Sequence, residues 1–291
     1  MTGPGRVEGR GLVSWKVPAG LVLWVLILYA NALDNDFHYD DTHSLIDNTS
    51  VRSLGNVGRF FSDPGSFSAM PDARMYRPLL LVTYAVNYAI GGYDSFGYHL
   101  FNVLLHAANV CLVWLVARRV LGGHGTALTA ALLFATHPVV SEPVNYVSSR
   151  STSLAALFVL GAIVVMVDGA RRPCWRHHAA LTALAAAALL SKSVGVVLLP
   201  AAALWLWLLG PGTRASWVLL AGPALAAGAY VLGTRVIVSK ALLEPVRTLS
   251  IQLATQLKAI PFYAYTNLMP AHLSVEPQFF VAPGVLGLVP M

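Results

Sequence analysis

Continuous apolar runs with very few charges are the feature that most constrains this chain. They lie at residues 17–33, 96–121, 126–140, 151–167, 179–190, 194–209 and 215–238, with a weaker run at 250–269 and another at 279–291. A helix needs about 20 predominantly apolar residues to cross a bilayer, and runs without two-residue alternation are helices rather than barrel strands. Only 11% of the 291 residues are charged, against roughly 25% in an average soluble domain. The sequence therefore excludes a soluble enzyme, a disordered chain and a coiled coil, and it predicts an all-α polytopic membrane protein.

Basic residues indicate which side of the membrane each loop faces. If residues 77–90 form an interfacial helix on the outer leaflet instead of a span, the basic clusters and the N-terminus fall on one side. The positive-inside rule favours this arrangement. It predicts about eight to nine transmembrane helices, a cytoplasmic N-terminus at 1–16, a transmembrane domain at 17–291 and a first external loop at 34–97. An alternative for the first run is a cleaved signal peptide, with Ala30-Asn31-Ala32 as its cleavage site.

The net charge of +6 is explained by basic loops on the cytoplasmic side. No nucleic-acid partner is predicted, and the lipid bilayer is the expected environment.

Acidic residues gather in the predicted external loop. Eight of the 13 lie between residues 34 and 97, although acids contribute little to topology. Asp40 and Asp41 stand together shortly after the first run. Adjacent carboxylates repel, so one can have a raised pKa and accept a proton near neutral pH. The pair can also hold a divalent cation. The alternative is a hydrated loop start in which the aspartates cap helices.

Three cations, Arg77, Arg150 and Lys192, are predicted on the same outer side as these acids. Cations that converge near carboxylates suit an anionic lipid phosphate beside a base. Lys192 can equally extend towards lipid headgroups. His137 and Glu142 lie at the outer interface, in the segment that joins two apolar runs.

The run at 96–121 carries a polar stripe, formed by His99, Asn102, His106 and Asn109 at spacings of three, four and three. These residues share one helix face, which must meet protein or water rather than lipid. Interhelical hydrogen bonding is the alternative to a ligand site. The spacing lacks a zinc-binding pattern, so no metal is predicted there.

Six segments in order carry a resemblance to a known family. They are FHYDD (37–41), MYRPLLLVTYAVNYAIGG (75–92), FGYHLFNVLLH (96–106), HPVVSEPVNYVSSRSTSLAALF (137–158), LLSKSVGVVLLP (189–200) and NLMPAHLSVEP (267–277). Together they resemble the membrane part of the transmembrane and tetratricopeptide-repeat O-mannosyltransferases and their bacterial relatives. The broader class is the GT-C glycosyltransferases. The resemblance extends from about residue 21 to residue 277.

The resemblance implies a GT-C-type membrane domain and inverting transfer of a hexose, expected to be mannose. The donor would be a polyprenyl-phosphate sugar, and the acceptor a protein or glycan hydroxyl at the external face. Asp40 would be the general base and Asp41 its neighbour in the acidic motif. Positions expected to serve the donor phosphate or the acceptor are Arg77, His99, His137, Glu142, Arg150 and Lys192. Apart from a divalent cation at the acid pair, no cofactor is expected. The abundance of Ala, Val, Leu, Gly and Arg favours a bacterial inner membrane over the endoplasmic reticulum.

Three features depart from the family pattern. Thr152 and Ser193 stand where the family usually has an acid, after Arg150 and Lys192 respectively. The sequence also holds no helical-pair repeat of about 34 residues and stops before the remaining spans. It is therefore expected to be a fragment, or one half of a split protein whose second chain supplies the missing helices or repeats. The alternatives to an active enzyme are an inactive accessory subunit and a lipid or solute transporter. The position of the acids outside the membrane argues against the transporter.

Overall fold

The protein is described here by a computed structural model that covers residues 15–243, 249–270 and 273. These residues form helices and connecting loops, with no strand among them. Three helical segments are long and apolar enough to cross a membrane: α4 (Ser95–Leu121), α7 (Arg150–Gly169) and Arg214–Arg235. A fourth results if α5 (His124–Thr136) and the segment Pro138–Asn145, bent by 58°, count as one span. The chain is thus a helical membrane protein. The number of spans expected from the sequence, about eight to nine, is not confirmed.

Further helices cover the other apolar runs. These are α1 (Lys16–Leu28), α8 (Trp175–Ser191), α9 (Leu198–Leu209), α10 (Arg214–Val218), α11 (Ala221–Leu243) and α12 (Leu249–Leu268). Helices α10 and α11 together contain the candidate span Arg214–Arg235. The first run does not continue as one helix, because the backbone leaves α geometry at Tyr29 and tightens into η1 (Ala30–Asp34). The run expected at 279–291 and the residues before 15 lie outside the described part of the chain.

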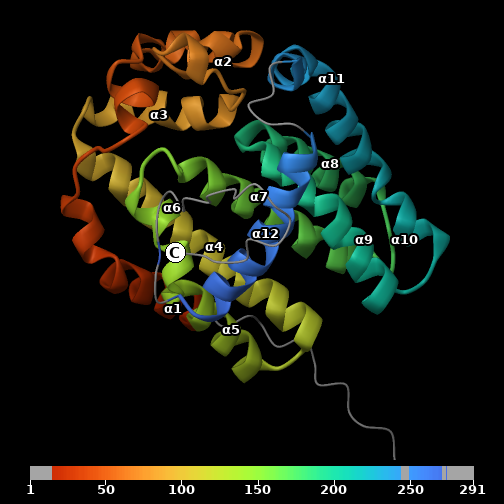
Figure 1. Cartoon of the computed structure of the whole chain (residues 1–291). Coiled ribbons are helices and arrows are strands. Elements are labelled where there is room, and N and C mark those ends of the chain that lie inside the picture. Colours follow the sequence, from red (N-terminus) through yellow and green to blue (C-terminus); the bar gives the residue numbers. More distant parts are fainter. Residues whose placement is uncertain (1–14, 244–248, 271–272, 274–291) are drawn as a thin grey trace, which may run out of the picture.

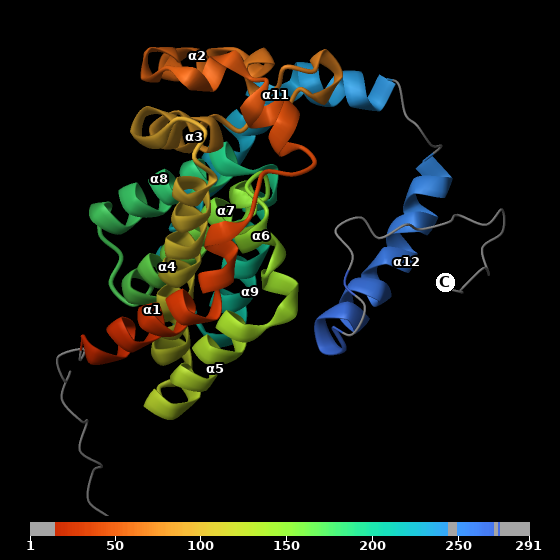
Figure 2. The ribbon, with the colours of Figure 1, turned by 90° about the vertical axis from the view of Figure 1, so that its left-hand side faces the viewer.

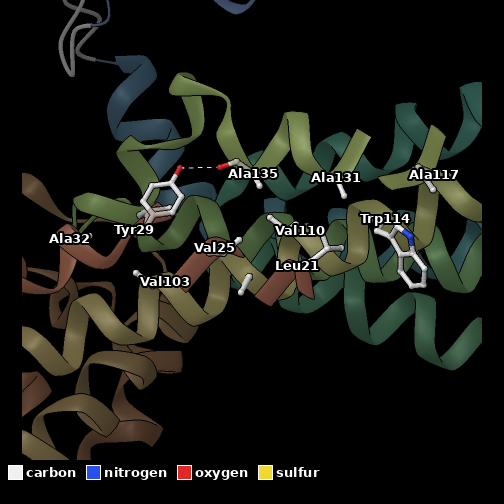
Figure 3. Close-up of a cluster of buried hydrophobic side chains, with 13 residues drawn as sticks. Leu21, Val25, Tyr29, Ala32, Val103, Val110, Trp114, Ala117, Ala131 and Ala135 are labelled. Carbon is white, nitrogen blue, oxygen red and sulfur yellow. Dashed lines mark hydrogen bonds between the residues drawn. The ribbon is translucent and has the colours of Figure 1, made fainter. Parts of the chain in front are cut away.

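Helix α4 lies at the centre and packs against α1, α5 and α7, while α8 packs on α7 and α11 (Figures 1 and 2). Figure 3 shows the core between α1, α4 and α5, where Val25 and Val110 meet small side chains such as Ala131. Small residues let helix backbones approach closely in a membrane. The Tyr29 hydroxyl donates a hydrogen bond of 3.4 Å to the carbonyl of Ala135, which fixes the end of α1 against α5.

The long loop after η1 is built from short helices. They are η2 (Thr42–Ile46), η3 (Thr49–Arg52), η4 (Leu54–Asn56), α2 (Val57–Ser62), η5 (Pro64–Phe67), η6 (Pro71–Ala73) and α3 (Pro78–Gly91). Helix α3 confirms the helix expected at 77–90, although its place at a membrane surface stays a prediction. It begins with proline, which suits a first helical turn, and ends at Gly92, whose φ of 60° favours glycine. Figures 1 and 2 show α2 and α3 stacked across one end of the long helices.

The acid-rich loop and two basic clusters lie at opposite ends of the bundle. The first turns of α4 and α7 lie next to α3, as the contacts of Arg150 with both helices show. At the far ends of the same two helices, the Arg119 Nε atom lies 2.6 Å from Asp168 Oδ1. The acid-rich loop and the basic clusters around Arg119 and Arg171 are therefore separated by the length of α4.

Candidate active site

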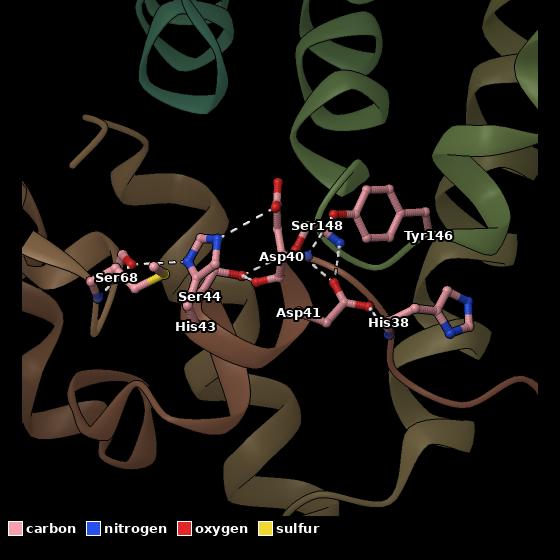
Figure 4. Close-up of polar contacts among 9 residues, drawn as sticks. His38, Asp40, Asp41, His43, Ser44, Ser68, Tyr146 and Ser148 are labelled. Carbon is pink, nitrogen blue, oxygen red and sulfur yellow. Dashed lines mark hydrogen bonds and ion pairs between the residues drawn. The ribbon is translucent and has the colours of Figure 1, made fainter. Parts of the chain in front are cut away.

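An unusual backbone turn sets the directions of the two adjacent aspartates. Tyr39 has a φ of 51°, a left-handed conformation that is uncommon outside glycine. The π-helical turn η2 begins three residues later, directly after the two aspartates. Both features are found often at functional sites. A strained backbone conformation persists only where the surrounding structure holds it in place. As a result, Asp40 points outward and Asp41 points into the fold (Figure 4).

Asp41 is fully buried and connects the first loop to the segment before α7. Its Oδ1 accepts hydrogen bonds from the Ser148 backbone N–H at 2.8 Å and the Ser148 hydroxyl at 2.6 Å. Its Oδ2 accepts from the His38 N–H at 3.1 Å. Burial raises the pKa of Asp41, and these hydrogen bonds oppose the rise. The sequence predicted that repulsion between the two aspartates raises the pKa of one of them. For Asp41 the main cause of the raised pKa is burial.

Asp40 presents an exposed carboxylate on a fixed backbone. Its side chain is 64% exposed. Its backbone N–H donates to the Tyr146 hydroxyl at 2.9 Å, and its carbonyl accepts from the Ser44 hydroxyl at 2.6 Å. The carboxylate oxygen Oδ1 lies 3.4 Å from His43 Nε2, and His43 Nδ1 lies 2.9 Å from the Ser68 hydroxyl. This arrangement holds the carboxylate in place while leaving it open to a ligand (Figure 4).

Arg77 and Lys192 rest on consecutive hydroxyls in the first turn of α7. Arg77 Nη1 donates to the Ser151 hydroxyl at 3.1 Å, and Lys192 Nζ donates to the Thr152 hydroxyl at 2.8 Å. Burial lowers the pKa of Lys192, and the nearby charge of Arg77 lowers it further. Burial also lowers the pKa of Arg77, while the negative charge of Asp40 acts in the opposite direction. The structure thus brings these two cations together on the Asp40 side of α7.

Arg150 occupies a different environment from the other two cations. It is fully buried and lies over the Phe101 ring at 4.5 Å. Its guanidinium donates to Asn102 at 2.6 Å, to Asn87 at 2.7 Å and to the Tyr98 carbonyl at 2.9 Å. A phosphate does not reach this position in the present arrangement. Arg150 instead positions the start of α7 against α3 and α4.

The remaining predicted site residues are spread over three places. His99 is buried in α4, about one turn before Asn102, which accepts a hydrogen bond from Arg150. His137 caps η7 (Pro138–Val140), and its Nε2 lies 2.9 Å from the carbonyl oxygen of Asn267 in α12. Glu142 begins α6 (Glu142–Asn145), is exposed, accepts from the Ser149 hydroxyl at 2.6 Å and acts electrostatically on Lys192. Only Glu142 among these three adds a charge near the cation pair.

Several residues near Asp40 were not selected from the sequence. They are His43, Ser68, Tyr146 and Ser148. His43 carried a detectable signal, because a residue three positions after Asp40 lies on its side of a helical turn. Ser68 and Ser148 carried none, since only the tertiary fold brings them close.

A divalent cation at the acid pair stays a prediction. Two of the oxygens that would bind it belong to Asp41 and already accept three hydrogen bonds. Within the described ranges no group of three or more His, Cys, Asp or Glu residues could hold a metal ion.

Taken together, the helices and the acid-rich loop define a helical membrane protein that carries a cluster of acid and cations at one end of the bundle. Residues 77–239, more than half of the chain, match the family described as dolichyl-phosphate-mannose-protein mannosyltransferase. The chain belongs to this family, as its sequence motifs predicted.

Curated relatives of the chain carry names of the same kind. It is 33% identical over 186 residues to "Protein O-mannosyl-transferase Tmtc1" of Drosophila melanogaster, covering 62% of this chain and 21% of that protein. It is 30% identical over 194 residues to mouse "Protein O-mannosyl-transferase TMTC2", covering 62% and 22%. Human TMTC4, named likewise, is 32% identical over 152 residues, covering 46% and 20%. The chain spans about a fifth of the length of these relatives. No solved structure gives a significant match.

Proposed function

We propose that this chain is a membrane glycosyltransferase that moves a hexose, mannose by analogy with its relatives, onto a protein hydroxyl. The donor is a polyprenyl-phosphate sugar that approaches from the outer leaflet. The observation that carries the proposal is the exposed carboxylate of Asp40, which acts electrostatically on Arg77, while Arg77 and Lys192 bind neighbouring hydroxyls on one turn of α7. A base next to two cations suits transfer from a phosphate leaving group to a hydroxyl.

In this mechanism Asp40 removes the proton from the acceptor hydroxyl as its oxygen attacks the anomeric carbon. The bond from that carbon to the phosphate oxygen breaks, and the oxygen keeps the electron pair. Arg77 and Lys192 stabilise the charge that develops on the phosphate. Because attack and departure occur on opposite faces of the sugar, a single displacement inverts the anomeric configuration. A positioned general base typically contributes about 10²–10⁴-fold to the rate.

His43 supports the base in this proposal. Its Nε2 lies 3.4 Å from Asp40, while Ser68 holds its other ring nitrogen at 2.9 Å. A fixed imidazole orients the carboxylate and can share the proton that the carboxylate receives.

The test is Asp40→Asn, which keeps the shape of the side chain but removes its basicity. We expect sugar transfer from a labelled polyprenyl-phosphate donor to fall at least about 100-fold, with unchanged membrane insertion and thermal stability. Asp72→Asn, which changes another exposed acid of the same loop, serves as the matched control and should transfer normally. Transfer by Asp40→Asn at a near-normal rate would overturn the assignment.

A second candidate is an inactive accessory subunit of such an enzyme, working with another chain that supplies further helices or repeats. The presence of Thr152 and Ser193 at positions where the resemblance leads one to expect acids favours it. An absence of transfer by the wild-type chain alone, restored by a partner chain even when Asp40 is changed to Asn, would support this alternative.

A further inference from the structure

The side chains of Arg77 and Lys192 donate hydrogen bonds to uncharged groups at the start of α7. Arg77 and Lys192 each donate to a hydroxyl, those of Ser151 and Thr152. Among the described residues, the ion pairs within 4.0 Å join Asp40, Asp63 and Asp168 to other partners. Within the described part of the chain, neither cation therefore has a carboxylate in direct contact.

The nearest acids do not neutralise this pair. Asp40 acts on Arg77 only at a distance and pairs with His43. Glu142 acts on Lys192 at a distance and accepts a hydrogen bond from Ser149. The start of α7 adds the partial positive charge of a helix N-terminus. Two adjacent positive charges thus remain, and a ligand with two negative charges would balance both.

The lipid-linked donor and the lipid product of the proposed reaction differ in the negative charge of their phosphate groups. A polyprenyl-phosphate sugar is a phosphodiester with a single negative charge. When the bond from the sugar to the phosphate oxygen breaks, that oxygen becomes ionisable and the product is a lipid monophosphate. Phosphate monoesters have a second pKa near 6 and carry a charge of about −1.5 to −2 at pH 7. Product and donor thus differ by about one charge at the same cations.

We propose that the Arg77–Lys192 pair binds the lipid monophosphate product more tightly than the phosphodiester donor, so that the product inhibits transfer. The inference rests on the proposed function, because it takes the donor and product from that reaction. The side-chain partner of Lys192 is the neutral hydroxyl of Thr152, which leaves the charge of the lysine to the ligand. Sustained turnover then requires a separate reaction that consumes the monophosphate, for example by adding a new sugar to it.

The experiment measures binding without any sugar transfer. The probes are citronellyl phosphate and citronellyl methyl phosphate, which share a lipid tail and differ by one ionisable oxygen. Binding to the purified full-length chain in detergent is followed by thermophoresis at pH 7.5. We expect the monophosphate to bind at least about tenfold more tightly. Equal affinities for the two probes would overturn the proposal.

Thr152→Asp places a carboxylate beside Lys192 and is compared with Thr152→Asn, which has the same size and no charge. We expect Thr152→Asp to remove the preference for the monophosphate and Thr152→Asn to keep it. Loss of the preference in both variants would show that shape rather than charge decides, and would overturn the proposal. Lys192→Gln should weaken monophosphate binding more than diester binding, which provides a second measure if Thr152→Asp does not fold.

The outcome is separable from that of the proposed function. Selective monophosphate binding by a chain that transfers no sugar would contradict the proposed function and leave the binding site intact. Sugar transfer that added citronellyl phosphate does not inhibit would contradict this inference and leave the enzyme assignment intact.

Discussion

Arg150 illustrates how a single buried charge can organise the start of a membrane helix. Its guanidinium bonds to side chains of α3 and α4, and aromatic rings enclose it. Arg150→Met should therefore lower the free energy of unfolding by about 3–5 kcal/mol, because the polar groups around the lost charge stay buried without partners. The thermal midpoint in detergent measures this loss. Arg59→Met, which breaks the exposed pair with Asp63, is the control and should cost about 0–1 kcal/mol. Similar midpoints for the two variants would contradict the role assigned to Arg150.

The sequence predicted candidate site residues, and their reactivity stays a prediction, but it did not predict the direction in which each side chain points. The acid pair and the cations were predicted, because charges are scarce in this chain and their positions are informative. The opposite orientations of Asp40 and Asp41 were not predictable, since they depend on Ser148, which lies 107 positions after Asp41. For the same reason Arg150 was expected to contact a ligand, although its partners in α3 and α4 bury it.

At the scale of elements, the junction between α8 and η8 (Ser193–Val197) determines where Lys192 lies. The Lys192 N–H donates to the Ala188 carbonyl, and the Gly195 N–H donates to the Lys192 carbonyl at 2.9 Å. A Cβ atom on Gly195 would lie 2.6 Å from the Ala188 carbonyl carbon. We expect Gly195→Ala to cost about 1–3 kcal/mol of stability through overpacking and to weaken lipid-phosphate binding by displacing Lys192.

Gly228→Ala, a substitution in α11, is the control, since an added Cβ there meets nothing within 4 Å. It should leave the thermal midpoint and lipid-phosphate binding unchanged. An unchanged midpoint and affinity in Gly195→Ala would show that the junction can shift without moving Lys192.

The positions of the long helices could be predicted from the sequence, but the breaks between helices could not. Hydropathy predicted α4, α7 and α11, because an unbroken apolar run specifies a helix wherever it packs. The breaks at Tyr29 and His137 were not predictable, since they arise from local backbone turns and from a side-chain cap. Within the described ranges, the apolar runs therefore outnumber the helices that are long enough to cross a membrane.

At the scale of the whole molecule, the separation of charges predicts an orientation in the membrane. The acid-rich loop and the Asp40 site lie at the end of the bundle where α4 and α7 begin. The basic residues 118–119 and 171–172 lie where these helices end, and the Arg119–Asp168 pair holds the two ends together. Positive residues favour the cytoplasmic side. The Asp40 site should therefore face away from the cytoplasm, where a lipid-linked donor in the outer leaflet can reach it.

The two native cysteines make this orientation testable. Cys174 is exposed in the basic turn between α7 and α8, and Cys111 is half-buried within α4. A membrane-impermeant maleimide should label Cys174 only after cells are permeabilised. In a Cys174→Ser background, Asp72→Cys, at an exposed position of the acid-rich loop, should be labelled in intact cells. The Cys174→Ser variant alone gives the background from Cys111. Labelling of Cys174 in intact cells, with protection of the cysteine introduced at position 72, would invert the orientation and place the Asp40 site in the cytoplasm.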